Sequence, residues 1–188
     1  MADTTKISEV PGQAPAKPRR SARVKAVEEA ARSYFDAISA RDPQGAASHL
    51  DADSIDDIVP LGVFRGPAEV RGFLVELFAA VPDLETTVTR VVADHEAAGV
   101  EWRMNGTFDG APFQGIDPTG KRIELRGFDC LEINDEGKIT RNTGYYDGAA
   151  FARQIGMLPP QDSGAERALR TGFNAVTKLR KQISSARG

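Results

Sequence analysis

Residues 121–146 read KRIELRGFDCLEINDEGKITRNTGYY, and this stretch decides the fold class. Two extended runs, 121–133 and 138–146, are rich in β-branched and aromatic residues, and only Gly127 interrupts the first. Asp135-Glu136-Gly137 lies between them and predicts a hairpin turn. We therefore expect two long neighbouring antiparallel strands.

The residues before this hairpin predict more strands and, earlier still, helices. Residues 86–92 are rich in β-branched residues, residues 99–108 alternate apolar and polar positions, and residues 54–61 form a shorter apolar run. Apolar residues recur every three or four positions in helices predicted at 22–41, 43–50 and 68–81, with a further short helix at 149–155. Helices followed by a run of strands predict an α+β fold, with the helices gathered on one face of a curved, mostly antiparallel sheet.

The two ends of the chain differ from this central part. Residues 1–21 are rich in proline, alanine and charge and are expected to form a disordered tail, whereas 22–160 form the folded domain. Residues 161–188 are expected to hold an amphipathic helix, at 163–184, with an apolar stripe and many basic residues. This stripe must be covered by the protein's own body, a second subunit, a separate partner or a membrane surface.

Composition narrows the functional classes. The 188 residues are 40% hydrophobic and 27% charged, with a net charge of −3, which argues against a general nucleic-acid binder. No apolar run is long enough to cross a membrane or to form a signal-peptide core. With one cysteine, Cys130, the chain cannot form an internal disulfide, so we expect a cytoplasmic protein.

Several short motifs, in this order, resemble the SnoaL-like polyketide cyclase branch of the nuclear transport factor 2-like superfamily. The resemblance covers about residues 24–160 and rests on Pro82-Asp83-Leu84, Trp102–Thr107 (WRMNGT), Gly115, Pro118–Lys121 (PTGK), Gly127-Phe128-Asp129, Glu136–Ile139 (EGKI), Asp147 and Gln154–Pro159 (QIGMLP). It implies a cone-shaped α+β barrel around a deep apolar pocket, which binds a small apolar organic molecule. It also implies a homodimer formed through the outer sheet face, with the C-terminal helix as a candidate contributor.

The resemblance points to two candidate catalytic residues. Tyr34 and Asp129 match the oxyanion-hole pair of the related ketosteroid isomerases, in which a tyrosine and a protonated aspartic acid donate hydrogen bonds to a dienolate oxygen. Strand alternation places Asp129 on the same inward face as Leu131, where burial would raise its pKa and favour the donor form. The alternative is that Tyr34 and Asp129 only stabilise the cavity wall.

The other catalytic residues of these relatives are absent. The isomerase general base would fall near Val59, the essential aspartate of the cyclases aligns with Gly144, and the Arg-x-Asp of the epoxide hydrolases becomes Arg103-Met104-Asn105. The proton would then be moved by Asp57 or His49. Asp56 and Asp57 lie next to the Val59 position, and a small register shift would bring one of them to the cavity mouth. An epoxide hydrolase of the known type is not expected.

The remaining expectations concern the pocket wall and cofactors. The predicted pocket residues are Trp102, Met104, Arg103, Asn105, Phe128, Leu131 and Val59. The two histidines lack metal-ligand spacing, so neither a metal nor another cofactor is expected. Two functions remain open: cofactor-independent acid–base catalysis on an apolar, polyketide- or steroid-like carbonyl compound, or a non-catalytic ligand-binding or assembly module of the same fold.

Overall fold

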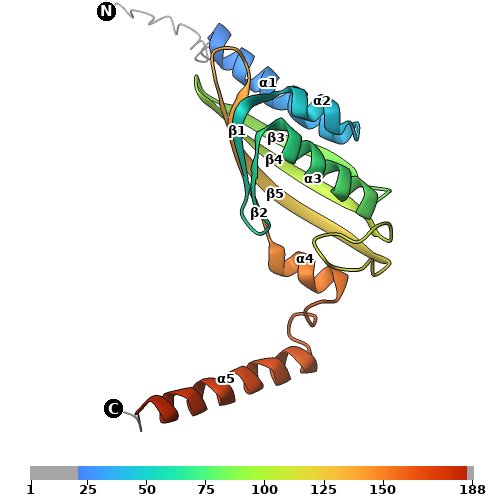
Figure 1. Cartoon of the computed structure of the whole chain (residues 1–188), viewed down its shortest axis with the longest axis vertical. Helices are drawn as coiled ribbons and strands as arrows, with labels where there is room; N and C mark the ends of the chain where they lie inside the picture. The colour runs from blue at the N-terminus through green and yellow to red at the C-terminus, as the bar shows by residue number, and fades with distance from the viewer. Residues whose placement is uncertain (1–20, 186–188) are drawn as a thin grey trace, which may run out of the picture.

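The computed structural model describes residues 21–185, and its centre is one six-stranded sheet with helices against one face (Figure 1). The strand order is β2-β1-β6-β5-β4-β3, with all neighbouring pairs antiparallel except β1 and β6. The predicted α+β class is confirmed; the sheet is open, so β2 and β3 form its edges. In chain order the elements are α1 (Ala22–Ser39), α2 (Pro43–Ser48), β1 (Leu50–Ile58), β2 (Gly62–Arg65), α3 (Gly66–Ala80), β3 (Glu85–Ala93), β4 (Ala97–Phe108), β5 (Lys121–Ile133), β6 (Ile139–Tyr146), α4 (Gly148–Ile155) and α5 (Gly164–Ser185).

Local signals fix the first helices. The Ser21 hydroxyl caps α1 by accepting from the Val24 amide, and Asp42 caps α2, with Pro43 in its first turn. The Arg41 guanidinium donates to the carbonyl oxygens of Phe78 and Val81 at the end of α3. These bonds satisfy carbonyls that a helix end leaves free, so they hold α1 and α3 together over the sheet.

The first strand differs most from the sequence prediction. The sequence predicts a short strand at 54–61, whereas β1 begins at Leu50 and ends at Ile58. The chain then reverses, and β2 pairs back on β1 with Ile58 opposite Gly62. Pro60 and Gly62 indicate a turn in the sequence and lie at a turn in the structure. Only the pairing of β2 with β1 shows that another strand follows this turn.

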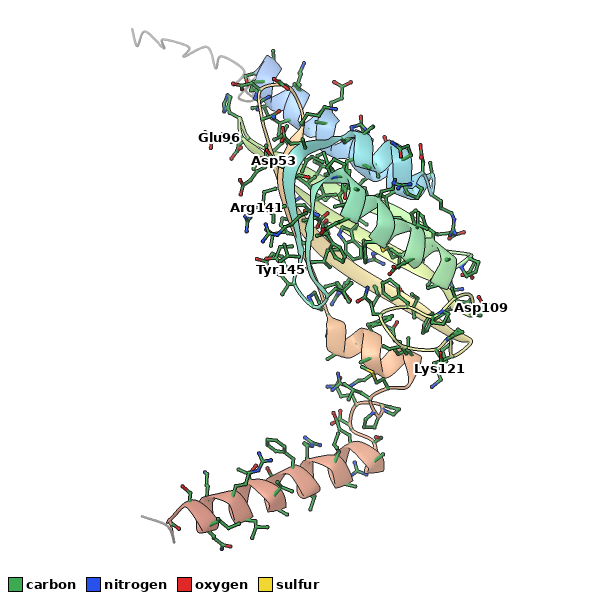
Figure 2. All side chains as sticks on the ribbon, in the orientation of Figure 1. Asp53, Glu96, Asp109, Lys121, Arg141 and Tyr145 are labelled. Atoms are coloured by element: carbon green, nitrogen blue, oxygen red, sulfur yellow. The ribbon has the colours of Figure 1, made fainter. Side chains whose placement is uncertain are left out.

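Strand alternation separates an inner sheet face from an outer one. On β5, Ile123, Asp129 and Leu131 are buried, whereas Phe128 and Cys130 are exposed, so Cys130 points away from the interior. Arg141 and Tyr145 on β6 project from the side of the sheet opposite α1–α3 (Figure 2). The core therefore lies between the inner face and the helices.

The C-terminal helix stands apart from this core. α5 extends away from the domain beyond α4 (Figure 1), and none of its described residues is buried. The chain's own body therefore does not cover its apolar stripe within residues 21–185. No helix in this described range is long and apolar enough to cross a membrane. The predicted tail at 1–21 lies, apart from Ser21, outside the described residues, and the cytoplasmic location stays a prediction.

Candidate functional site

An apolar cavity of about 100 Å³ lies between α1, α3 and the inner sheet face. Its wall is built mostly from aliphatic and aromatic side chains, among them Phe35, Phe73, Trp102, Phe108 and Phe113. Asp56, Asp129 and Asn142 are its strongly polar members, and all three are buried. Few convergent polar groups in an apolar wall are the usual composition of a small-molecule site.

Strand register brings these polar groups together. Asp56 on β1 lies opposite Asn142 on β6, and Asp129 on β5 lies opposite Gly144 on β6. Trp102 on the next strand, β4, shares the inward face with Asp129. Four adjacent strands thus present one row of polar groups, and Tyr34 reaches it from α1.

The row is a continuous hydrogen-bond chain. Tyr34 Oη donates to Asp56 Oδ2 over 3.4 Å, and Trp102 Nε1 donates to Asp129 Oδ1 over 2.7 Å. Between them, Asn142 Nδ2 donates to Asp56 Oδ1 over 3.1 Å and to Asp129 Oδ2 over 2.8 Å. Each carboxyl oxygen therefore accepts one bond, and a single amide group bridges the two acids.

Among residues 21–185 the two acids have no cationic partner, since no lysine, arginine or histidine of this range lines the cavity. Burial and the nearby Asp129 carboxyl raise the pKa of Asp56 from 3.8 to about 7. Burial also raises the pKa of Asp129, although Trp102 and Asn142 oppose this shift by hydrogen bonding to its charged form. Two buried carboxylates without a cation are costly, so the pair retains a proton near neutral pH.

Tyr34 and Asn142 supply hydrogen-bond donors that contact the two acids. Burial and the two acids raise the pKa of Tyr34 well above 10, so its hydroxyl remains a donor. The bridging role commits both amide hydrogens of Asn142, and within the described residues its Oδ1 has no hydrogen-bond partner. The 3.4 Å hydrogen bond from Tyr34 is the longest of the four bonds that link these side chains. The Tyr34 hydroxyl is therefore the donor that can most easily exchange its present acceptor for a ligand oxygen.

Four residues predicted from the sequence line the cavity: Tyr34, Asp129, Trp102 and Met104. Tyr34 is on the buried stripe of α1, and the other three are on inward positions of β4 and β5. Their catalytic or binding roles stay predictions.

Of the residues predicted to transfer the proton, Asp57 and His49 do not line the cavity, whereas the alternative, Asp56, does. Asp57 faces away from the cavity because Asp56, its neighbour on β1, takes the inward position. His49 lies at the C-terminal end of α2, where partial burial and Lys138 lower its pKa. Val59 lies beyond the end of β1 and is 52% exposed.

Five of the seven predicted wall residues lie outside the cavity, and Val59 is one of them. Arg103 and Asn105 alternate with Trp102 and Met104, so they face the outer side of β4, and Phe128 does the same on β5. Leu131 faces inward and is fully buried, but it packs in the hydrophobic core and does not reach the cavity.

The sequence interpretation gave less weight to Asp56 and did not include Asn142. In β1 the structure turns Ser54 and Asp56 inward, and both side chains are buried. For β6, one signal was available: Asn142, Gly144 and Tyr146 share a phase, opposite to the surface residues Arg141 and Tyr145. A polar residue in the inward phase marks a candidate site residue.

The site defines a class of protein: a cone-like α+β domain whose apolar cavity holds hydrogen-bonded acids. The SnoaL-like polyketide cyclase family matches residues 28–155, and the chain belongs to this family. Within residues 21–185, no cluster of three or more histidine, cysteine, aspartate or glutamate side chains could hold a metal ion.

Solved structures share this fold. A proposed SnoaL-like polyketide cyclase from Jannaschia sp. CCS1 is 20% identical, with a TM-score of 0.68, and the match covers 76% of this chain and 100% of that one. A proposed polyketide cyclase from Xanthomonas campestris pv. campestris is 20% identical, with a TM-score of 0.62 and coverage of 71% and 99%. A protein of ketosteroid isomerase-like fold from Catenulispora acidiphila, solved with trimethylamine, is 18% identical, with a TM-score of 0.58 and coverage of 70% and 98%. No curated protein matches the chain.

Proposed function

We propose that the protein is a cofactor-independent acid–base catalyst acting on an apolar, polyketide- or steroid-like carbonyl compound. The observation that carries this proposal is the pair of buried acids, Asp56 and Asp129, bridged by Asn142 in an otherwise apolar cavity with no cation. A structural role alone would not require two acids at this place, because burying an unpaired carboxyl costs several kcal/mol. Such groups cluster where proton transfer is needed.

The proposed step is proton removal next to the carbonyl. The reacting form of the pair carries its one proton on Asp129, so that Asp56 is charged and takes a proton from the α-carbon. The electron pair of the broken C–H bond forms the C=C bond of the enolate, and the π pair of the carbonyl moves to its oxygen. Tyr34 and protonated Asp129 donate hydrogen bonds to the resulting enolate oxygen. Asp56 then returns the proton to the same or a conjugated carbon, so no other reactant is consumed. Donors fixed in advance in a dry cavity contribute several kcal/mol to such steps.

The test measures enolisation directly. The α-hydrogens of 1-tetralone, an apolar bicyclic ketone, exchange with deuterium in D₂O, and proton NMR follows the loss of signal. The wild-type protein is expected to accelerate this exchange, and Asp56→Asn is expected to reduce the acceleration at least tenfold, because one general base contributes about 10²-fold or more. Asp129→Asn is expected to reduce it at least tenfold as well, with binding retained.

Asp57→Asn is the matched control, since it makes the same chemical change one residue away on the side that faces away from the cavity. It is expected to retain most of the acceleration. Circular dichroism checks that each variant is folded. If the wild type binds 1-tetralone, as seen by a change in Trp102 fluorescence, but none of the proteins accelerates exchange, the enzymatic proposal is wrong for this class of ketone.

A binding or assembly module without catalysis is the second candidate. Gly144 favours it, since this position lacks the carboxylate expected from the cyclases and a Cβ there would lie 3.1 Å from Asp129 Oδ1. This reading predicts that Asp129→Asn lowers the melting temperature and leaves exchange unchanged.

We further propose a homodimer formed through the outer sheet face. Phe128 and Tyr145 are paired across β5 and β6, are 43% and 52% exposed, and make an apolar centre on this face. Sedimentation equilibrium at micromolar concentration is expected to give a dimer for the wild type and a monomer for Phe128→Glu. A wild-type monomer at that concentration contradicts the proposal.

A further inference from the structure

The helix α5 presents an apolar stripe that the described part of the chain leaves uncovered. Its members recur at spacings of three and four, which places them along one side of the helix. They are Leu169, Phe173, Val176, Leu179 and Ile183, and each is between 47% and 71% exposed. Five large apolar side chains in water carry a cost that a covering surface would remove.

The polar side of α5 is strongly basic. Five cations, Arg167, Arg170, Lys178, Arg180 and Lys181, lie on this helix with a single acid, Glu166. At 100° per residue, four of the cations lie on the side opposite the stripe, and Arg180 alone falls within it. The whole chain carries a net charge of −3, so α5 concentrates positive charge on an otherwise acidic protein.

The one acid is already paired. Glu166 accepts from the Arg153 guanidinium over 3.2 Å, and Arg170 lies 3.8 Å from its other carboxyl oxygen. The helix beyond it, residues 167–185, contains no acidic residue. A helix with an apolar stripe, and with only cations among the charged residues of its polar side, combines the two features that hold a helix in the interface of an anionic bilayer.

A second copy of α5 fits this stripe less well. Two such helices packed stripe to stripe would have no acid in residues 167–185 to form the complementary charge pairs that normally flank such a seam. Arg180 would also lie within the seam. On a bilayer, its long stem can follow the apolar stripe while its guanidinium reaches the phosphates.

We propose that α5 binds anionic membrane surfaces, lying in the plane of the interface with its apolar stripe in the acyl-chain boundary. The test is sedimentation of the full-length protein with vesicles of phosphatidylcholine containing one third phosphatidylglycerol, and with vesicles of phosphatidylcholine alone. Binding is expected to be at least tenfold tighter on the anionic vesicles and to weaken as salt is added.

Phe173→Glu and Asn174→Glu form a matched pair, because both add one negative charge to adjacent exposed positions and only the first disrupts the stripe. Phe173→Glu is expected to weaken partitioning at least about tenfold more than Asn174→Glu does, since it removes the burial of a phenylalanine in the acyl-chain boundary. Both side chains are exposed, so circular dichroism should show unchanged folding.

Three results would overturn the proposal: no binding to anionic vesicles at low salt, equal binding to both kinds of vesicle, or equal effects of the two variants. Should vesicles fail to bind while Phe173→Glu converts a larger assembly to a smaller one in sedimentation equilibrium, a second copy covers the stripe instead.

Discussion

Replacing Asp56 with asparagine is expected to remove a large pH dependence from the stability of the fold. The side chain is 3% exposed and has no cationic partner, so its charged form is poorly stabilised. Asparagine has the same shape and remains neutral. Its oxygen can still accept from Asn142, and its amide group can donate to the Tyr34 hydroxyl.

The magnitude follows from the pKa of Asp56, which burial and the Asp129 carboxyl raise from 3.8 to about 7. Between pH 3.8 and about pH 7, Asp56 holds a proton in the folded protein that it has released in the unfolded chain. The free energy of unfolding therefore decreases as the pH rises through this range. Each unit of difference corresponds to about 1.4 kcal/mol, which gives a loss of about 4 kcal/mol between pH 4 and pH 8. Asp56→Asn lacks this contribution.

Urea unfolding followed by circular dichroism, at several pH values from 4 to 8.5, measures the effect. The free energy of unfolding of Asp56→Asn relative to wild type should increase by about 4 kcal/mol across this range, with most of the change below pH 7. Asp53→Asn, at an exposed position of the same strand, is the control for changes in overall charge. A difference between Asp56→Asn and wild type that stays constant from pH 4 to pH 8 would refute the reasoning.

Two further substitutions test the surroundings of the site by urea unfolding. Trp102→Phe retains an aromatic ring but removes the hydrogen-bond donor to Asp129, so at pH 8 it should lower the free energy of unfolding by about 1.5–3 kcal/mol. Unfolding is followed by circular dichroism, because Trp102 is the only tryptophan and its fluorescence is lost in this variant. An unchanged urea midpoint would show that this hydrogen bond does not stabilise the fold. Gly127→Ala would press a methyl group onto the Trp102 indole and should cost about 1–3 kcal/mol. Gly72→Ala, on the exposed side of α3 with open space around it, should instead stabilise by up to about 1 kcal/mol, and equal effects of the two alanines would contradict the packing argument.

Sequence patterns alone determined the fold class and most elements. The helical stripe of α1, the strand-rich run from β3 to β6 and the hairpin turn at 135–137 were all readable, because their periodicity follows directly from which side of an element faces the core. The same alternation placed Asp129 inward and Cys130 outward. The β2 strand was missed because a turn signal cannot say whether the chain pairs again after it.

Only the tertiary structure decided which acids meet. Asp56 and Asn142 are separated by 86 positions, and they become neighbours because β1 lies parallel to β6 in the middle of the sheet. The local sequence favoured Asp57 over its neighbour Asp56, and a register difference of one residue exchanges the inward and outward faces of a strand. The phase of a strand with few apolar residues is set by its neighbours, so the composition of the site could be determined only once the sheet was assembled.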